Sequence, residues 1–170
     1  DLRVVDSDGA AVPPGEIGAL WARGPNITKG YLNLPDETAS ALSDGWFHTG
    51  DMARIDAEGY VYLLDRLKDL VISGGENVYS SEVEAALHRH PSVLEAAIIG
   101  VPDDRLGEAL FGVVVLRPEC EVTAEELIAH CRDLIGGYKI PRRYAFVEAL
   151  PKSALGKVLK ADLRDQYSKN

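Results

Sequence analysis

A lysine near the carboxyl end of the chain lies in a segment that could present its charge to a phosphate. Residues 151–157 read Pro-Lys-Ser-Ala-Leu-Gly-Lys, so Lys157 directly follows a glycine. A lysine on a glycine-containing loop offers a mobile point charge, which can offset negative charge on a phosphate or on a developing oxyanion. Because surface lysines are common, an ordinary exposed loop is the simpler explanation of this segment taken alone.

Two earlier segments could also take part in ligand binding. Residues 46–51 read Trp-Phe-His-Thr-Gly-Asp, and a carboxylate after a tight Thr-Gly turn can accept hydrogen bonds from sugar hydroxyls. Residues 65–69 read Asp-Arg-Leu-Lys-Asp and lead to Gly74 and Gly75, which permit close backbone approach to a ligand. This stretch contains neither the dinucleotide-binding glycine fingerprint nor a P-loop. Taken singly, a turn cap at Asp51 and an ordinary glycine turn are the simpler explanations.

The composition indicates a globular protein that does not bind nucleic acid. The 170 residues are 46% hydrophobic and 26% charged, and the formal net charge is −9. This acidity argues against a nucleic acid as the main partner. The stretch from Tyr138 to Arg164 departs from the trend, with seven basic and two acidic residues. Such a basic end could attract a phosphate-bearing small molecule.

Membrane, secretory and metal-binding signals are missing from the sequence. No apolar run approaches the roughly 20 residues that cross a bilayer. No secretory leader opens the chain, so we expect a cytoplasmic protein without a transmembrane segment. Cys120 and Cys131 are the two cysteines and lack the spacing of metal ligands, so we expect no metal site.

The first third of the chain, which contains Asp51, is predicted to be rich in β-strands. Strand-like runs at residues 2–5 and 17–21 alternate with turn clusters, and the Asp-Ala-Glu-Gly segment at 56–59 predicts a hairpin turn. A short helix is expected to begin at Pro35. The chain starts abruptly in a strand-like segment, so we expect that its start is a truncation.

From about Asp69 the pattern changes to mixed helices and strands. Ser81-x-x-Glu84 and Thr123-x-x-Glu126 predict two capping boxes, each followed by apolar residues at helical spacing. The remaining predicted elements are three strands and a final helix, at residues 96–99, 111–116, 144–147 and 160–167. Helices and strands that intermix in this way predict an α+β domain of about 100 residues.

In their order and spacing, the three segments together resemble the ANL superfamily of adenylate-forming enzymes. This superfamily includes acyl- and aryl-CoA synthetases, luciferases and the adenylation domains of peptide synthetases. The resemblance covers essentially the whole chain, and the wording of residues 65–79 is most similar to bacterial fatty-acid-CoA ligases. It implies that residues 1–67 are the β-rich end of a large N-terminal domain, here truncated. Residues 68–170 would then be the small mobile C-terminal α+β domain.

The resemblance also implies roles in nucleotide binding and catalysis. Asp51 matches the family aspartate that binds the ribose hydroxyls of ATP and AMP. Arg66 matches the arginine that also contacts the ribose and nucleotide. Lys157 matches the catalytic lysine, which reaches the α-phosphate and the substrate carboxylate during adenylation.

Further family positions concern the change between half-reactions. Lys68 occupies the hinge about which the small domain swings. Gly74 and Gly75 match the strand that lines the coenzyme A pantetheine passage after the swing. The chain carries Leu106 where many relatives have tryptophan, which puts in doubt how coenzyme A is gripped there.

The function implied is that of an AMP-forming acid-thiol ligase that uses ATP, Mg²⁺ and coenzyme A. A fatty acid is the expected substrate, and an aryl acid such as benzoate or a hydroxycinnamate is the alternative. A non-catalytic or regulatory fragment of the same family is a third possibility. A peptide-synthetase module is disfavoured, because a carrier domain would have to follow the lysine loop. The phosphate loop and the adenine-binding segment of the family do not occur here, so these residues alone are expected to be inactive.

Overall fold

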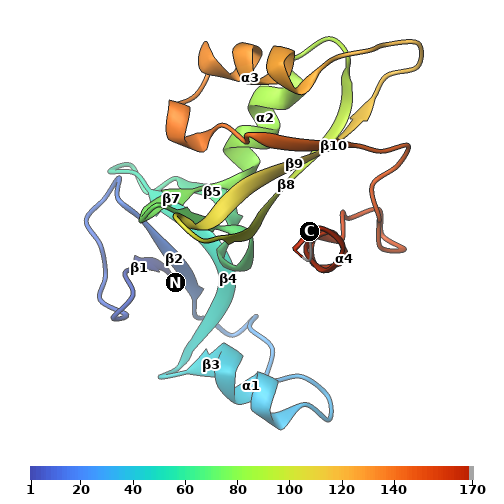
Figure 1. The fold of residues 1–170 in the computed structure, drawn as a ribbon. Helices are drawn as coiled ribbons and strands as arrows, with labels where there is room; N and C mark the ends of the chain where they lie inside the picture. Colours follow the sequence, from blue (N-terminus) through green and yellow to red (C-terminus); the bar gives the residue numbers. More distant parts are fainter. Residues whose placement is uncertain (169–170) are drawn as a thin grey trace. The chain divides into compact units, whose positions relative to one another are not determined.

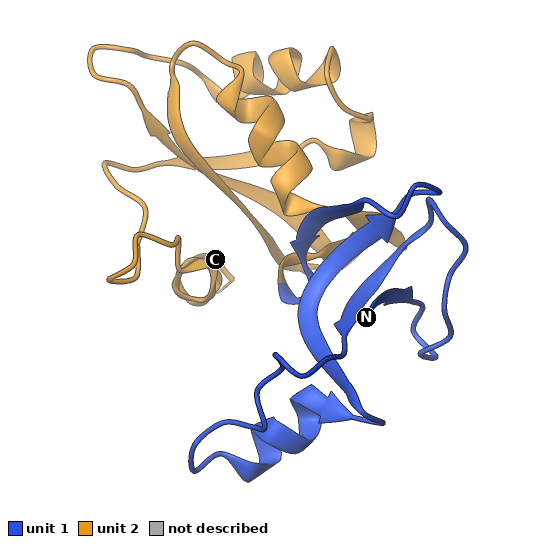
Figure 2. Cartoon of the chain, turned by 180° about the vertical axis from the view of Figure 1, so that it is seen from behind, with its two compact units in different colours: residues 1–68 blue, residues 69–170 orange. Residues whose placement is uncertain are grey.

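The chain folds into two compact units. The computed structural model describes residues 1–168, and the contacts divide the chain into unit 1, residues 1–68, and unit 2, residues 69–170 (Figure 2). Unit 1 is a β-sheet with one short helix, whereas unit 2 combines a second sheet with three α-helices. The predicted α+β class is therefore confirmed. Among the described residues, no helix is long and apolar enough to span a bilayer.

Unit 1 is organised around one long strand, β4 (Trp46–Ile55). One edge of β4 pairs with β2 (Ile17–Ala22), which in turn pairs with β1 (Leu2–Val5), and all these pairings are antiparallel. The other edge pairs with β3 (Leu42–Ser43) near its start and with β5 (Val61–Arg66) near its end. The helix α1 (Pro35–Ala41) precedes β3, as the proline predicted. Val4, Leu20 and Ala53 form the buried core of this sheet.

The hairpin between β4 and β5 forms where the sequence predicted it. The Asp56 carboxylate accepts hydrogen bonds from the backbone nitrogens of Glu58 and Tyr60, at 3.1 and 2.8 Å, and from the Tyr62 hydroxyl at 2.9 Å. Gly59 completes the turn with a φ of +88°, a conformation that favours glycine. This turn sets the register of the adjoining pairs as far as Ala53 and Leu63, and an irregularity between Met52 and Ala53 then shifts the register so that Asp51 pairs with Arg66.

Unit 2 is built on a five-stranded sheet. The strands β8 (Val93–Asp103) and β9 (Gly107–Leu116) form a long antiparallel hairpin. The short strand β10 (Arg143–Phe146) pairs with β9 in parallel, and β6 (Val71–Ser73) joins β9 at its start and pairs with β7 (Glu76–Val78). Two 3₁₀ turns complete the connections, at Leu67–Asp69 and Gly137–Lys139.

Both faces of the β8–β9 hairpin are covered by helices (Figure 1). One face packs against α2 (Ser80–His88) and α3 (Ala124–Arg132), with Ile98 and Val114 among the buried strand residues. The opposite face packs against α4 (Lys160–Tyr167), whose Leu163 contacts a cluster that includes Ile99 and Val113. Since neighbouring residues of a strand point to opposite faces, each strand supplies both clusters in alternation.

One of the two predicted capping boxes is correct and the other is wrong. Thr123 caps α3 with the reciprocal bonds to Glu126 that define the box. The prediction fails for α2, because this helix begins at Ser80 and its N-cap, Tyr79, makes no side-chain capping bond. Glu84 is the fifth residue of the helix, whereas a capping box requires its acidic residue at the third position. Its carboxylate instead accepts a hydrogen bond from the Ile98 nitrogen at 2.8 Å and pairs with Lys160 at 2.7 Å.

A histidine pair at the junction of α2 and α3 predicts a pH-dependent stability. His90 stacks edge-on against His130, and both burial and the His130 charge lower the pKa of His90 below its usual 6.5. A lowered histidine pKa favours the folded state above about pH 6.5, and this stabilisation is lost as the pH falls through and below that value. We therefore expect the His90→Asn variant to lose less stability than the wild type between about pH 7.5 and 5.5.

Urea unfolding at the two pH values measures this difference directly. His88→Asn is the matched control, because His88 is exposed and lies only two residues before His90, at the end of α2. Its pH dependence should equal that of the wild type. An identical loss of unfolding free energy in the wild type and in His90→Asn would show that His90 does not cause the effect.

Candidate functional site

The structure pairs Asp51 with Arg66 on neighbouring strands of unit 1. The two residues are register partners of β4 and β5, and Arg66 Nε lies 3.0 Å from Asp51 Oδ1. Arg66 Nη1 also donates to the Thr49 carbonyl at 3.4 Å. The Asp51 carboxylate is 25% exposed, so it can accept hydrogen bonds from a ligand while the guanidinium holds it in place.

The tight turn predicted before Asp51 is wrong, because residues 48–51 lie inside the continuous strand β4, where the Thr49 hydroxyl holds a local irregularity. Thr49 Oγ1 donates to the Leu20 carbonyl at 2.8 Å and accepts from the Asp51 nitrogen at 3.1 Å. Gly50 between them has a φ of +73°, where a side chain would be strained. The Thr49 hydroxyl thus holds the backbone at Asp51 against β2, in addition to the pairing of Asp51 with Arg66.

Lys157 lies in a tight hairpin between β10 and α4. The Ser153 nitrogen donates to the Lys157 carbonyl at 2.8 Å, and the Lys157 nitrogen bonds the Ser153 hydroxyl at 3.2 Å. Gly156 turns the chain with a φ of +78°. Lys157 is exposed, and within residues 1–168 its ammonium has no ion-pair partner. The hairpin therefore presents an uncompensated positive charge to solvent.

A groove of about 480 Å³ opens in unit 2 beside the turn between β8 and β9. Gly74 lines it, and the Gly74 nitrogen donates to the Leu106 carbonyl at 2.9 Å. A Cβ at Gly74 would lie 3.2 Å from Leu106 Cδ2, and the φ of Gly74 is +60°. Gly75, with a φ of +85°, follows outside the groove lining. The two glycines therefore have different tasks, and only Gly74 faces this groove.

The groove combines apolar and basic walls. Its apolar residues include Leu106, Tyr138 and Ile140, and its basic residues are Arg105, Arg142 and Arg143. Arginine guanidinium groups suit phosphate recognition, because they offer several donors in a fixed plane. The groove could hold a ligand that has both phosphates and an apolar or aromatic part.

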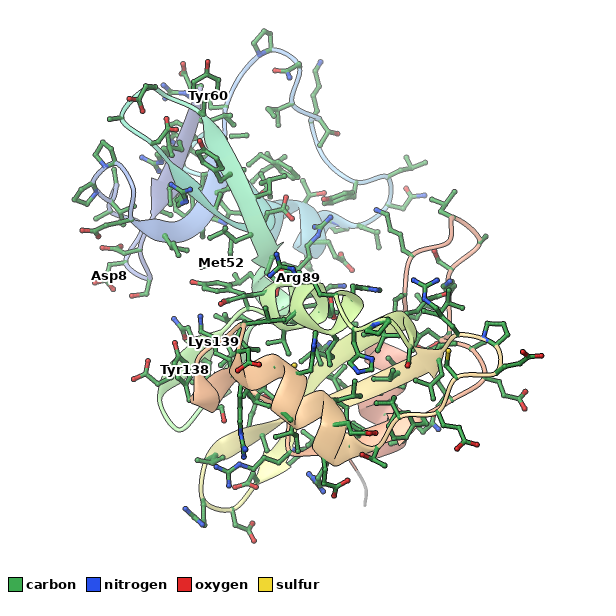
Figure 3. The ribbon with its side chains drawn as sticks, turned by 90° about the horizontal axis from the view of Figure 1, so that it is seen from above. Asp8, Met52, Tyr60, Arg89, Tyr138 and Lys139 are labelled. Atoms are coloured by element: carbon green, nitrogen blue, oxygen red, sulfur yellow. The ribbon has the colours of Figure 1, made fainter. Side chains whose placement is uncertain are left out.

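Asp103 lines the groove, and Glu82, which lies outside the groove lining, bonds the neighbour of Tyr138. Asp103 Oδ1 accepts from the backbone nitrogens of Arg105 and Leu106, both at 3.0 Å, and these bonds lower the pKa of Asp103. Next to the groove residue Tyr138 is Lys139 (Figure 3), whose Nζ lies 2.7 and 2.8 Å from the Glu82 carboxylate oxygens. Burial opposes the charge of Lys139, but the Glu82 carboxylate outweighs it and raises the pKa of Lys139. Both carboxylates thus stabilise the loops that carry the groove residues.

Sequence reasoning found Gly74 and Leu106 but not Tyr138 and the arginines of this groove. The basic character of residues 138–164 was visible, yet nothing in the sequence connected it to the glycines. The connection depends on β10, which pairs in parallel with β9 and so brings Arg143 beside the β8–β9 turn.

The remaining predicted position, Lys68, lies in the 3₁₀ turn Leu67–Asp69. Lys68 is exposed and is the last residue of unit 1, whereas Asp69 is buried and begins unit 2. Within residues 1–168, no group of three or more His, Cys, Asp or Glu side chains could hold a metal ion.

The chain is similar in sequence to several known proteins. Residues 82–157 match the AMP-binding enzyme C-terminal domain. The chain is 46% identical to a feruloyl-CoA synthase of Amycolatopsis over 98% of its length, and 44% identical to a long-chain-fatty-acid–CoA ligase of Yersinia pestis over 99%. It spans 34% and 30% of those relatives.

A solved structure gives the same match in three dimensions. The chain superposes on ATP-bound MatB from Rhodopseudomonas palustris with a TM-score of 0.92, at 39% identity, over 99% of this chain and 34% of that one. The sequence resemblance to adenylate-forming enzymes is thereby confirmed. The chain belongs to the family of adenylate-forming enzymes, and it corresponds to their C-terminal portion.

Proposed function

We propose that this chain is the C-terminal fragment of an ATP-dependent acyl-CoA ligase. The enzyme would activate a carboxylic acid as acyl-AMP and transfer the acyl group to coenzyme A. The observation that carries the proposal is the unpaired Lys157 ammonium, presented by a hairpin in a chain whose relatives include CoA ligases. Residues 1–67 would end the large domain, and residues 68–170 would form the small one.

In the first half-reaction, the residues of this chain would bind ATP and offset developing charge. The Asp51 carboxylate would accept hydrogen bonds from the ribose hydroxyls, with Arg66 beside it. Mg²⁺ arrives on the phosphates of ATP as part of the substrate. Lys157 would approach the α-phosphate and the substrate carboxylate, two anions that otherwise repel each other. The product is a mixed anhydride with AMP as leaving group.

In the second half-reaction, unit 2 would turn about Lys68 and replace Lys157 by the groove at Gly74. Lys68 fits a hinge because it lies in a short 3₁₀ turn at the boundary between the two units, where a change of backbone angles would turn one unit without rearranging its core. The groove fits coenzyme A, whose phosphates would meet Arg105, Arg142 and Arg143. Tyr138 offers an aromatic face that could compensate for the tryptophan that Leu106 replaces.

We further propose a fatty acid as the substrate. The wording of residues 65–79 supports it, and one relative with 44% identity is a long-chain-fatty-acid–CoA ligase. An aryl acid is the second candidate, because a feruloyl-CoA synthase is 46% identical. Since ATP and coenzyme A are cytoplasmic metabolites, we place the reaction in the cytoplasm. Residues 1–170 alone are expected to form no acyl-AMP.

Pyrophosphate release from ATP by the longer protein proposed here tests this function. The acids supplied would run from short to long fatty acids and include benzoate and coumarate. We expect release with fatty acids and matching formation of the acyl-CoA. Release with an aryl acid alone would replace the substrate and keep the mechanism. No release with any acid would favour a non-catalytic role and contradict the proposal.

Substitution of Lys157 should separate the two half-reactions. We expect Lys157→Ala to slow acyl-AMP formation by about 100-fold or more, since it removes a charge that acts in the transition state. Thioester formation from supplied acyl-AMP should change little, because Lys157 would then be withdrawn. Single-turnover assays of each step measure both rates.

Lys29→Ala provides the control, because it removes an exposed lysine of unit 1. Both half-reactions should proceed at the wild-type rate in this variant. An equal loss of both half-reactions in Lys157→Ala would rule out the division of labour.

A further inference from the structure

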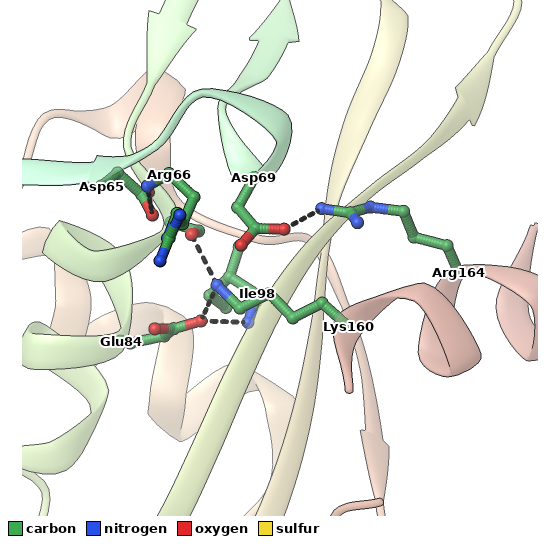
Figure 4. A network of polar contacts seen from close by, with 8 residues as sticks. Asp65, Arg66, Asp69, Glu84, Ile98, Lys160 and Arg164 are labelled. Carbon is green, nitrogen blue, oxygen red and sulfur yellow. Dashed lines mark hydrogen bonds and ion pairs between the residues drawn. The ribbon is translucent and has the colours of Figure 1, made fainter. Parts of the chain in front are cut away.

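Two basic residues on one face of α4 contact carboxylates that lie far away in the sequence (Figure 4). Lys160 and Arg164 are four residues apart, so their side chains emerge on the same side of the helix. Lys160 reaches Glu84 and Arg164 reaches Asp69, each at 2.7 Å. We call this set of four residues the α4 clasp.

The Lys160 half of the clasp joins α4 to α2. Lys160 Nζ lies 2.7 Å from Glu84 Oε1 and donates to the Ser80 hydroxyl at 2.6 Å. The same Glu84 oxygen accepts from the Ile98 nitrogen at 2.8 Å, which adds strand β8 to the contact. The side chains of Lys160 and Glu84 are only 13% and 20% exposed. Because water reaches these two charged groups only in part, each depends on the other for compensation of its charge.

The Arg164 half joins α4 to the start of unit 2. Arg164 Nη2 bonds Asp69 Oδ1, and the two side chains are 28% and 12% exposed. Asp69 directly follows Lys68, the proposed hinge. Loss of Arg164 would remove this cation from the largely buried Asp69 carboxylate, which is unfavourable. This pair therefore ties α4 to the residue from which unit 2 begins.

The clasp lies at the base of the Lys157 hairpin. Lys160 is three residues after Lys157, and the Leu159 nitrogen closes the hairpin on the Pro151 carbonyl at 2.8 Å. On the opposite arm, Lys152 pairs with Glu95 of β8 at 2.7 Å. The lysines on both sides of Lys157 are thus paired with carboxylates and anchor the hairpin.

We infer that Lys160 and Arg164 are positioning residues for Lys157, which fix its hairpin to α2 and to the first residue after the hinge. This inference rests on the proposed function. A rotation about Lys68 would then carry Lys157 to the α-phosphate as part of a rigid unit. Neither Lys160 nor Arg164 has to touch the substrate. No residue of α4 lines the groove at Gly74, so the second half-reaction should not depend on the clasp.

Disruption of the Arg164 pair tests the inference in the longer protein proposed above. In Arg164→Gln, a freer hairpin should lower the rate of acyl-AMP formation by between about 10-fold and 100-fold, as a misplacement of about 1 Å can do. Thioester formation from supplied acyl-AMP should stay within about twofold, a change too small to indicate misplacement. Arg164→Lys should recover part of the first rate. The double variant with Asp69→Asn should lose little more than the single variants.

Arg132→Gln is the matched control, because Arg132 is an exposed cation in the last turn of α3. It should leave both half-reactions unchanged. Hydrogen–deuterium exchange supplies a readout that does not require activity. The amides of residues 153–159 should exchange faster in Arg164→Gln than in the wild type or in Arg132→Gln.

Two results would overturn the positioning role. One is an equal loss of both half-reactions in Arg164→Gln, which a purely structural role would cause. The other is an unchanged rate of acyl-AMP formation together with unchanged exchange of residues 153–159. If the wild type formed no acyl-AMP at all, the proposed function would fail, and the exchange rates alone would decide whether the clasp holds the hairpin.

Discussion

Burial of both faces of the β8–β9 hairpin is the constraint on which unit 2 depends. Residues such as Ile98 and Val114 are buried under α2 and α3, while their neighbours Ile99 and Val113 are buried under α4. A shift of one residue in either strand would turn each side chain to the other face, where it would meet helices whose side chains are packed against a different set. The register is therefore strongly determined, and every element attached to the hairpin inherits a fixed position.

The two chemical features of unit 2 are attached to different parts of this hairpin. The turn between the strands carries Leu106, which bonds Gly74 and forms one side of the groove. The face under α4 supports the helix that begins three residues after Lys157. One rigid sheet can thus serve two half-reactions, provided that the whole unit turns. Rotation of unit 2 as a whole would then move both Lys157 and the groove, and neither would need a motion of its own.

The sequence predicted those features that depend on neighbouring residues. The turn at Asp56, the helix at Pro35 and the capping box at Thr123 all form as predicted, because each is held by bonds across a few residues. The family resemblance likewise rested on short segments, and the comparisons confirm it.

Features that depend on distant residues could not be predicted in this way. Glu84 was assigned to a capping box, but its partner is Lys160, 76 positions later, so the sequence window around α2 could not reveal it. The arginines of the groove were missed for the same reason, since the parallel pairing of β9 with β10 brings Arg143 to the groove. A local basic cluster indicates a function only when the topology supplies its counterpart.

In the proposed mechanism, unit 2 turns as one body about Lys68. Spin labels at Glu58 in unit 1 and Glu125 in unit 2, both exposed, test it in the longer protein with Cys120→Ser. Pulsed electron–electron double resonance would measure the distance between the labels in two complexes. One complex contains ATP and an unreactive acid analogue, and the other contains an acyl-adenylate analogue and coenzyme A. The account predicts a shifted Glu58–Glu125 distance and a constant Glu125–Asp162 distance within unit 2. An unchanged Glu58–Glu125 distance in both complexes would contradict it.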